Sequence, residues 1–201
     1  MERTLNLLPP ELSGALLYPL DRPARAALDL GRAPLSRTAA LGTAGLGLWA
    51  VSSVLANGLL GAWHSFDALG GALEALAVAF PGLLVFAAYL RVSVPPRALL
   101  AAQAVALWTC GVVSACLLPL LAFLAAASHG QLFALHLRGL LVPVVGLGVA
   151  SAVLLRVLRT FDARPRTRLL SHAFVAMVSV AFLVKLQMSF PYLLDLARSA
   201  R

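Results

Sequence analysis

Charged residues are scarce in this sequence. They make up 12% of its 201 residues, whereas hydrophobic residues make up 61%. An average soluble domain carries about a quarter charged residues. Long stretches of this chain contain no polar side chains that would cover a surface exposed to water. The shortage of charge therefore excludes an ordinary soluble globule and indicates an integral membrane protein.

Lysine is nearly absent, since Lys185 is the only lysine among the sixteen basic residues. This preference for arginine is typical of a GC-rich genome, and we expect a protein of the bacterial inner (cytoplasmic) membrane. The formal net charge of +8 would by itself suit nucleic acid. The arginines, however, cluster in short segments between apolar runs, where membrane topology accounts for them, so we expect no nucleic-acid partner.

Sequence signatures of catalysis and of metal binding are missing. The chain has no nucleophile elbow, no zinc-binding HExxH, no glycine-rich phosphate loop and no paired carboxylates within an apolar run. Cys110 and Cys116 would lie about 9 Å apart along a helix axis on roughly opposite faces, so they cannot pair. His129 and His136 are two helical turns apart, which is too far for adjacent metal ligands. We therefore expect no enzyme, no cofactor and no metal site.

Five apolar segments are long enough to cross a membrane, because about twenty helical residues span the roughly 30 Å hydrocarbon layer. Backbone polar groups cannot stay unpaired in lipid, and the segments lack the alternation of barrel strands, so each is predicted to be a helix. The expected fold class is an all-α transmembrane bundle. The predicted spans within residues 39–193 are 39–62, 69–90, 98–125, 139–158 and 169–193.

Arginine-rich and arginine-poor connections alternate along these spans. Residues 1–38 and the segments after the second and fourth spans are rich in arginine, whereas the segment after the first has none and the one after the third has only Arg138. Cytoplasmic connections are enriched in arginine and lysine. The alternation predicts an N-terminus in the cytoplasm and a C-terminus outside, with residues 194–201 as a short outer tail.

Residues 1–38 are too polar to span and are predicted to form a cytoplasmic or interfacial segment. Within them, Asp21 is expected to cap a short helix that has Pro23 near its start and Gly31 as its stop. Its apolar face would carry Ala24, Ala27 and Leu28. Such a helix would lie at the headgroup boundary, or alternatively pack on the bundle.

Two ionisable residues fall inside predicted spans, where a charge is costly and usually faces a partner or a cavity. Glu74 in the second span and Lys185 in the fifth are at similar depth in the outer half of the predicted bundle. One hypothesis is that they form a charge pair across the bundle. The alternative is that each side chain reaches separately to the outer headgroups.

Proline and polar residues inside the spans suggest kinks and packing contacts. Pro81 lacks the N–H that would bond the carbonyl four residues earlier, so the second span is predicted to kink there. In the third span Gln103, Cys110 and Ser114 share one helical stripe, which is predicted to face other helices. Pro81 and Gln103 would border a polar path in a transporter, whereas helix packing explains the same residues without one.

A basic loop follows the fourth span. Topology accounts for its charge, and contact with anionic lipids or with a protein partner is the alternative reading. Its arginines are Arg156, Arg159, Arg164, Arg166 and Arg168.

The layout of five spans over residues 39–193, preceded by the lead-in LLPPELSGALLYPLDRP at 7–23, resembles that of Yip1-type membrane proteins, which in eukaryotes act in vesicle trafficking. The resemblance implies a non-enzymatic accessory subunit or membrane organiser that contacts the lipid bilayer and a membrane-protein partner, or self-associates. The alternative is a small transporter or channel subunit with a polar path near Glu74 and Lys185.

Overall fold

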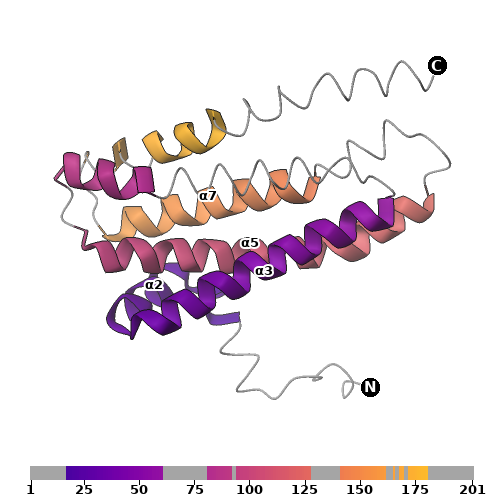
Figure 1. Cartoon of the computed structure of the whole chain (residues 1–201), viewed down its shortest axis with the longest axis horizontal. Coiled ribbons are helices and arrows are strands. Elements are labelled where there is room, and N and C mark those ends of the chain that lie inside the picture. Colours follow the sequence, from indigo (N-terminus) through magenta and orange to yellow (C-terminus); the bar gives the residue numbers. More distant parts are fainter. Residues whose placement is uncertain are drawn as a thin grey trace.

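A computed structural model describes residues 17–60, 81–91, 94–127, 141–161, 165, 168–169 and 172–180. Within these residues the chain is helical and contains no strand. The labelled helices are α2 (Pro23–Arg32), α3 (Leu35–Leu60), α5 (Pro96–Ala127) and α7 (Leu141–Phe161) (Figure 1). Residues 17–21, 81–89 and 172–180 are helical as well.

Three of the helices are long and apolar enough to cross a membrane. The qualifying stretches are Leu35–Ala56, Pro96–Phe123 and Val144–Phe161. They confirm helices at the predicted spans 39–62, 98–125 and 139–158, with ends that differ by a few residues. The described part of the chain is therefore free of strands and holds three candidate membrane-spanning helices.

The two remaining predicted spans are described only in part. Residues 81–89 of the predicted span 69–90 and residues 172–180 of the predicted span 169–193 are helical. Leu90 forms a turn and Leu169 is helical, and the other residues of these segments lie outside the described part of the chain.

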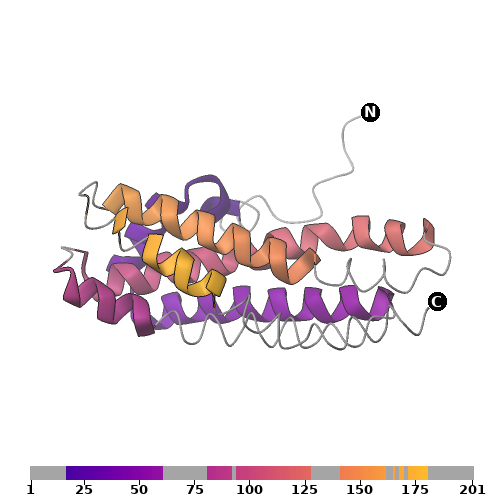
Figure 2. The same cartoon turned by 90° about the horizontal axis from the view of Figure 1, so that it is seen from above.

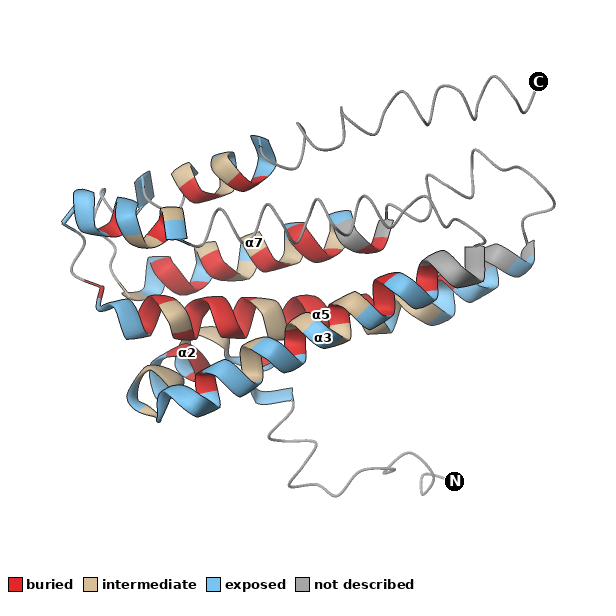
Figure 3. Ribbon diagram, viewed as in Figure 1, coloured by how far each residue is buried: buried red, intermediate tan, exposed pale blue. Residues whose placement is uncertain are grey.

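Helix α5 forms the centre of the bundle and contacts α2, α3 and α7. Helices α3 and α5 run in the same direction and α7 runs in the opposite one (Figures 1 and 2). Residues 101–106 of α5 are all buried (Figure 3). The side chains there are small, mostly alanine, which lets three helices approach one axis.

Helices α3 and α5 come into backbone contact at two glycines. A Cβ on Gly45 would lie 2.6 Å from the carbonyl carbon of Leu107 and closer still to the backbone nitrogen of Trp108. A Cβ on Gly111 would meet the carbonyl oxygen of Gly45 and lie 3.2 Å from the Cβ of Leu48. Only glycine fits at either position, because the two backbones touch directly.

Helix α2 differs from its predicted form at its start. Asp21 does not cap it, because Asp21 belongs to the preceding helical turn, and the N-cap residue is Arg22. No side-chain hydrogen bond caps the helix.

The end of α2 also differs, because Gly31 lies inside the helix. The helix runs on to Arg32 and ends where Ala33 is extended, with φ −76° and ψ 166°. Ala33 precedes Pro34, and a residue before proline avoids the helical conformation. The stop signal is therefore the proline and not the glycine.

The buried face of α2 consists of small residues. Ala26 and Ala27 are buried, whereas Leu28, which was predicted to share the face with Ala27, is 42% exposed. A Cβ on Gly31 would lie 3.6 Å from the Cα of Ala98 in α5. Small residues at this face let α2 pack closely against α5, so the helix lies on the bundle.

Candidate functional site

The described charges gather at one end of the bundle, where α3 and α5 begin and α7 ends (Figure 1). Residues 38–60, 98–127 and 141–155 carry no charged side chain. We call this end the arginine-rich end. Its described arginines are Arg22, Arg25, Arg32, Arg37, Arg91, Arg97, Arg156, Arg159 and Arg168.

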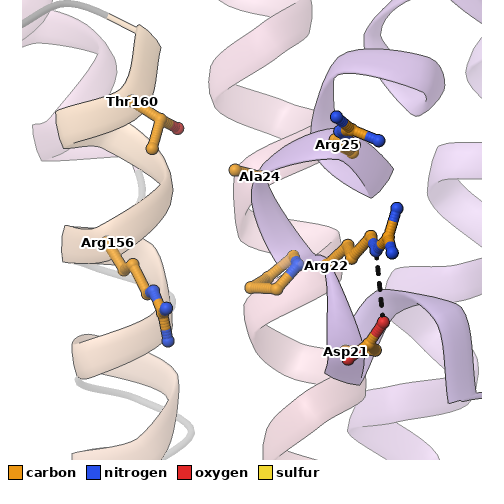
Figure 4. Close-up of a pocket in the computed structure, with 7 residues that line it drawn as sticks. Asp21, Arg22, Ala24, Arg25, Arg156 and Thr160 are labelled. Atoms are coloured by element: carbon orange, nitrogen blue, oxygen red, sulfur yellow. Dashed lines mark hydrogen bonds and ion pairs between the residues drawn. The ribbon is translucent and has the colours of Figure 1, made fainter.

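A cavity of about 450 Å³ opens between α2 and the last turns of α7 at this end. Figure 4 shows Arg156 and Thr160 on α7 facing the turn that starts α2. Its volume falls within the range of small-molecule sites, roughly 300–1,000 Å³. The lining residues are Asp21, Arg22, Pro23, Ala24, Arg25, Arg156 and Thr160.

The cavity carries three guanidinium groups against one carboxylate. Arg22 Nε lies 3.3 Å from Asp21 Oδ2, and both side chains are exposed, at 57% and 76%. Among the described residues no carboxylate pairs with Arg25 or Arg156. The described lining is therefore basic, and the guanidinium groups of Arg25 and Arg156 face no described carboxylate.

Local hydrogen bonds hold α2 in place beside the cavity. The hydroxyl of Thr38 in α3 donates to the carbonyl of Leu30 at 3.3 Å. The phenol of Tyr18 donates to Oδ2 of Asp29 at 2.9 Å. That hydrogen bond, together with the negative charge of Asp29, raises the pKa of Tyr18. These bonds tie the turn before α2, α2 itself and the start of α3 together.

A second polar region lies within the bundle, far from the charged end. A Cβ on Gly146 of α7 would lie 2.5 Å from Trp49 Nε1, 2.9 Å from Cys110 Sγ and 3.1 Å from Ser114 Oγ. Trp49, Cys110 and Ser114 are buried. Helices α3, α5 and α7 therefore meet at Gly146, where the lack of a side chain lets them approach.

Three buried polar atoms in the described bundle have no hydrogen-bond partner: Trp49 Nε1, Gln103 Oε1 and Ser114 Oγ. Gln103, Cys110 and Ser114, which were predicted to form a stripe that faces other helices, are all buried. Gln103 lies in α5 seven residues after its start at Pro96, so it is nearer to the arginine-rich end than Ser114 is.

A second cavity, of about 550 Å³, lies between α7 and residues 175–179. Its lining is mostly valine, leucine, alanine and glycine, and its polar side chains are Ser151 and Ser179. It carries no charge, so it gives no sign of the ligand it would select. The basic cavity is the stronger candidate site.

Some of the predicted site residues lie within the described part of the chain and others do not. Glu74 and Lys185 lie outside the described residues, as do Arg164 and Arg166 of the basic loop. Pro81 is the first residue of the described helical segment 81–89. The stretch before it, where a kink would show, lies outside as well.

Of the predicted basic loop, Arg156 lines the cavity, whereas Arg159 does not. Sequence reasoning missed Arg22 and Arg25 as residues that share a site with Arg156. The only signal was a short predicted helix with Pro23 near its start and Arg22 and Arg25 on either side of that proline, and nothing in the sequence pairs that helix with α7.

Among the described residues, no group of three or more histidine, cysteine, aspartate or glutamate side chains is placed to hold a metal ion. Comparison of the chain with protein-family models, with curated proteins and with solved structures finds no match.

Proposed function

We propose that this chain is a non-catalytic integral membrane protein that acts as an accessory subunit or membrane organiser. It works through contacts of its arginine-rich end with lipids and with other membrane proteins, or with a second copy of itself. The observation that carries the proposal is the segregation of the described charges to one end, where α2 packs beside α7. Juxtamembrane arginines attract anionic lipids by about 1 kcal/mol each near the surface.

The proposal includes five spans, a cytoplasmic N-terminus and an outer C-terminus. The arginine-rich end then faces the cytoplasm of a bacterial cell, in keeping with the enrichment of arginine on that side. Helix α2 lies at the boundary between bilayer and cytoplasm. A layout that resembles Yip1-type proteins supports a role outside catalysis.

The second candidate is a small transporter or channel subunit. The observation that favours it is the presence of buried polar atoms on Trp49, Gln103 and Ser114 that have no hydrogen-bond partner among the described residues. Such groups are costly in an apolar medium and often border a polar path. In this candidate Glu74, Lys185 and the predicted kink at Pro81 belong to the path.

Flux through reconstituted vesicles separates the two candidates. The organiser proposal expects no ion or solute flux above empty vesicles, and no change with Glu74→Gln. Glu11→Gln, outside the predicted spans, is the matched control. Flux that Glu74→Gln reduces and Glu11→Gln leaves intact would overturn the organiser proposal in favour of the transporter.

Site-specific photo-cross-linking in native membranes tests the contacts directly. A photoreactive residue is placed at Arg32 or Arg159, at the arginine-rich end, and as a control at Phe123, which is exposed near the other end of α5. The proposal expects a discrete protein adduct or a self-adduct from the arginine-rich end and none from Phe123. Equal protein adducts from all three positions, or none from any, would contradict it.

A further inference from the structure

The basic cavity has donors that suit a phosphate group. The planar guanidinium fork of arginine matches the oxygens of phosphate in two parallel hydrogen bonds, and charge makes these bonds stronger than neutral ones. Arg25 comes from α2 and Arg156 from α7, and both line the cavity. Figure 4 shows the two side chains on facing helices, with their guanidinium groups not turned toward each other. An anion contacted by both side chains would bridge the two helices.

The start of α2 adds to this preference. Pro23, at the first helical position, has no N–H, and no side chain caps the helix. The first turn of a helix carries unpaired N–H groups and a partial positive charge, both of which favour an anion. The cavity therefore combines guanidinium groups from two elements with an uncapped helix start.

Two lining residues limit what the cavity accepts. Asp21 opposes an anion and occupies Arg22, but an exposed pair of this kind is weak, so a phosphate can compete with it. The hydroxyl of Thr160 donates to the carbonyl of Val157 at 2.6 Å, so its proton is already used. Binding is thus expected to depend on Arg25 and Arg156 and hardly at all on Thr160.

The position of the cavity points to a lipid as the source of the phosphate. Arg156 lies at the end of the apolar part of α7, and Ala152, one turn earlier, is exposed. A headgroup in the cavity therefore leaves its acyl chains beside an apolar helix surface. Because the lining is basic, an anionic headgroup fits better than a zwitterionic one, whose cationic part the arginines repel.

We propose that the cavity formed by Arg25, Arg156 and the start of α2 binds the phosphate of an anionic phospholipid headgroup. This inference rests on the proposed function and deepens it, because it assigns the lipid contact to one defined site. The shared chemistry is a phosphate oxyanion, and the experiment distinguishes a lipid from free phosphate.

The experiment titrates the full-length purified protein with phosphatidylglycerol and counts bound lipids by native mass spectrometry. Arg25→Gln and Arg156→Gln are each expected to weaken the tightest lipid about tenfold, the loss typical of a hydrogen bond to a charged group. Arg156→Lys keeps the charge but not the fork, so an intermediate loss is expected. Asp21→Asn is expected to tighten binding, and Thr160→Val to change it less than twofold.

The matched control is Arg159→Gln, which removes the same charge from the same helix outside the cavity lining. Less than a twofold loss is expected. Equal losses for Arg159→Gln and Arg156→Gln would overturn the cavity site, while a role in general lipid contact would stand. Variants of the exposed arginines are checked for native thermal unfolding before titration.

Two further arms settle the source of the phosphate. Phosphatidylcholine is expected to bind at least tenfold more weakly than phosphatidylglycerol, and inorganic phosphate at millimolar concentration is expected to leave the bound lipid in place. Displacement of the lipid by inorganic phosphate would overturn the lipid assignment in favour of a free-anion site. Equal binding of phosphatidylcholine and phosphatidylglycerol would overturn both the cavity site and the lipid contact in the proposed function. Failure of the photo-cross-linking experiment alone would contradict the protein contacts and leave the cavity site intact.

Discussion

In the middle of the bundle α3 and α5 touch through their backbones at Gly45 and Gly111, whereas at the arginine-rich end α2 and α7 border an open cavity of about 450 Å³. The first region has no space for a single added carbon. The second holds three arginines and one aspartate, all exposed.

The difference reflects what stabilises each region. Inside a membrane, helices gain little from burying apolar surface, since lipid is equally apolar, so close packing of small residues holds them together. At the charged end, exposed arginines contribute little to stability, and Arg25 and Arg156 have no carboxylate partner among the described residues. Substitutions in the middle should therefore affect folding, and those at the end should affect binding.

The largest effect is expected from Gly45→Ala. Its Cβ would meet backbone atoms of Leu107 and Trp108, which cannot move unless α3 and α5 separate. We expect a loss of about 1–3 kcal/mol in the free energy of unfolding, the usual cost of overpacking. Unfolding in detergent, followed by circular dichroism, measures it.

The matched control is Gly47→Ala in the same helix, where an added Cβ meets nothing within 4 Å. Alanine is the better helix former by roughly 0.5–1 kcal/mol, so no loss is expected. If Gly45→Ala and Gly47→Ala have the same free energy of unfolding, the backbone contact at Gly45 does not stabilise the bundle.

A smaller loss is expected from Gly146→Ala. Its Cβ would meet side-chain atoms of Trp49, Cys110 and Ser114, and side chains can shift where backbone cannot. We expect about 1 kcal/mol, with Gly148→Ala as the control because its surroundings are open. A loss at Gly146 that exceeds the loss at Gly45 would contradict the ranking of backbone over side-chain contacts.

Tyr18→Phe is expected to have a slight effect that depends on pH. The raised pKa of Tyr18 means that its hydrogen bond to Asp29 contributes below the ordinary tyrosine pKa near 10 and is lost as the pH rises through the raised value. The ultraviolet absorbance of tyrosinate in the wild type minus that in Tyr18→Phe reports this titration. A midpoint at or below 10 would show that the bond to Asp29 does not form.

The smallest effect on stability is expected from Arg156→Gln. The side chain is exposed and lacks a carboxylate partner among the described residues, so the free energy of unfolding should change by less than about 0.5 kcal/mol. The same unfolding assay applies. A loss as large as that of Gly45→Ala would remove the contrast between the two regions.

The apolar helices could be predicted from the sequence because hydrophobic run length alone determines them. Spans predicted at 39–62 and 98–125 correspond to α3 (Leu35–Leu60) and α5 (Pro96–Ala127). The starts moved because prolines set them, as Pro34 does directly before α3 and Pro96 at the start of α5.

The cavity could not be predicted in the same way. Arg25 and Arg156 are 131 residues apart in the sequence, and only the docking of α2 on α5 and α7 brings them to one cavity. That docking depends on a face of small residues, Ala26, Ala27 and Gly31. A hydrophobic pattern alone does not show that these residues, and not Leu28, form the buried face. The glycine contact between α3 and α5 could not be predicted either. Several glycine spacings occur by chance in such a chain, and the sequence does not show which glycines lie in a helix contact.

The central claim is that the helices cross the membrane with the arginine-rich end in the cytoplasm. The most direct measurement labels single cysteines with a membrane-impermeant maleimide in right-side-out and inside-out vesicles, after Cys110 and Cys116 have been replaced by alanine. Arg159→Cys marks the arginine-rich end, and Ala126→Cys, exposed near the end of α5, marks the other. The account predicts that Ala126→Cys reacts only in right-side-out vesicles and Arg159→Cys only in inside-out vesicles. Reaction of both in the same vesicles would contradict it.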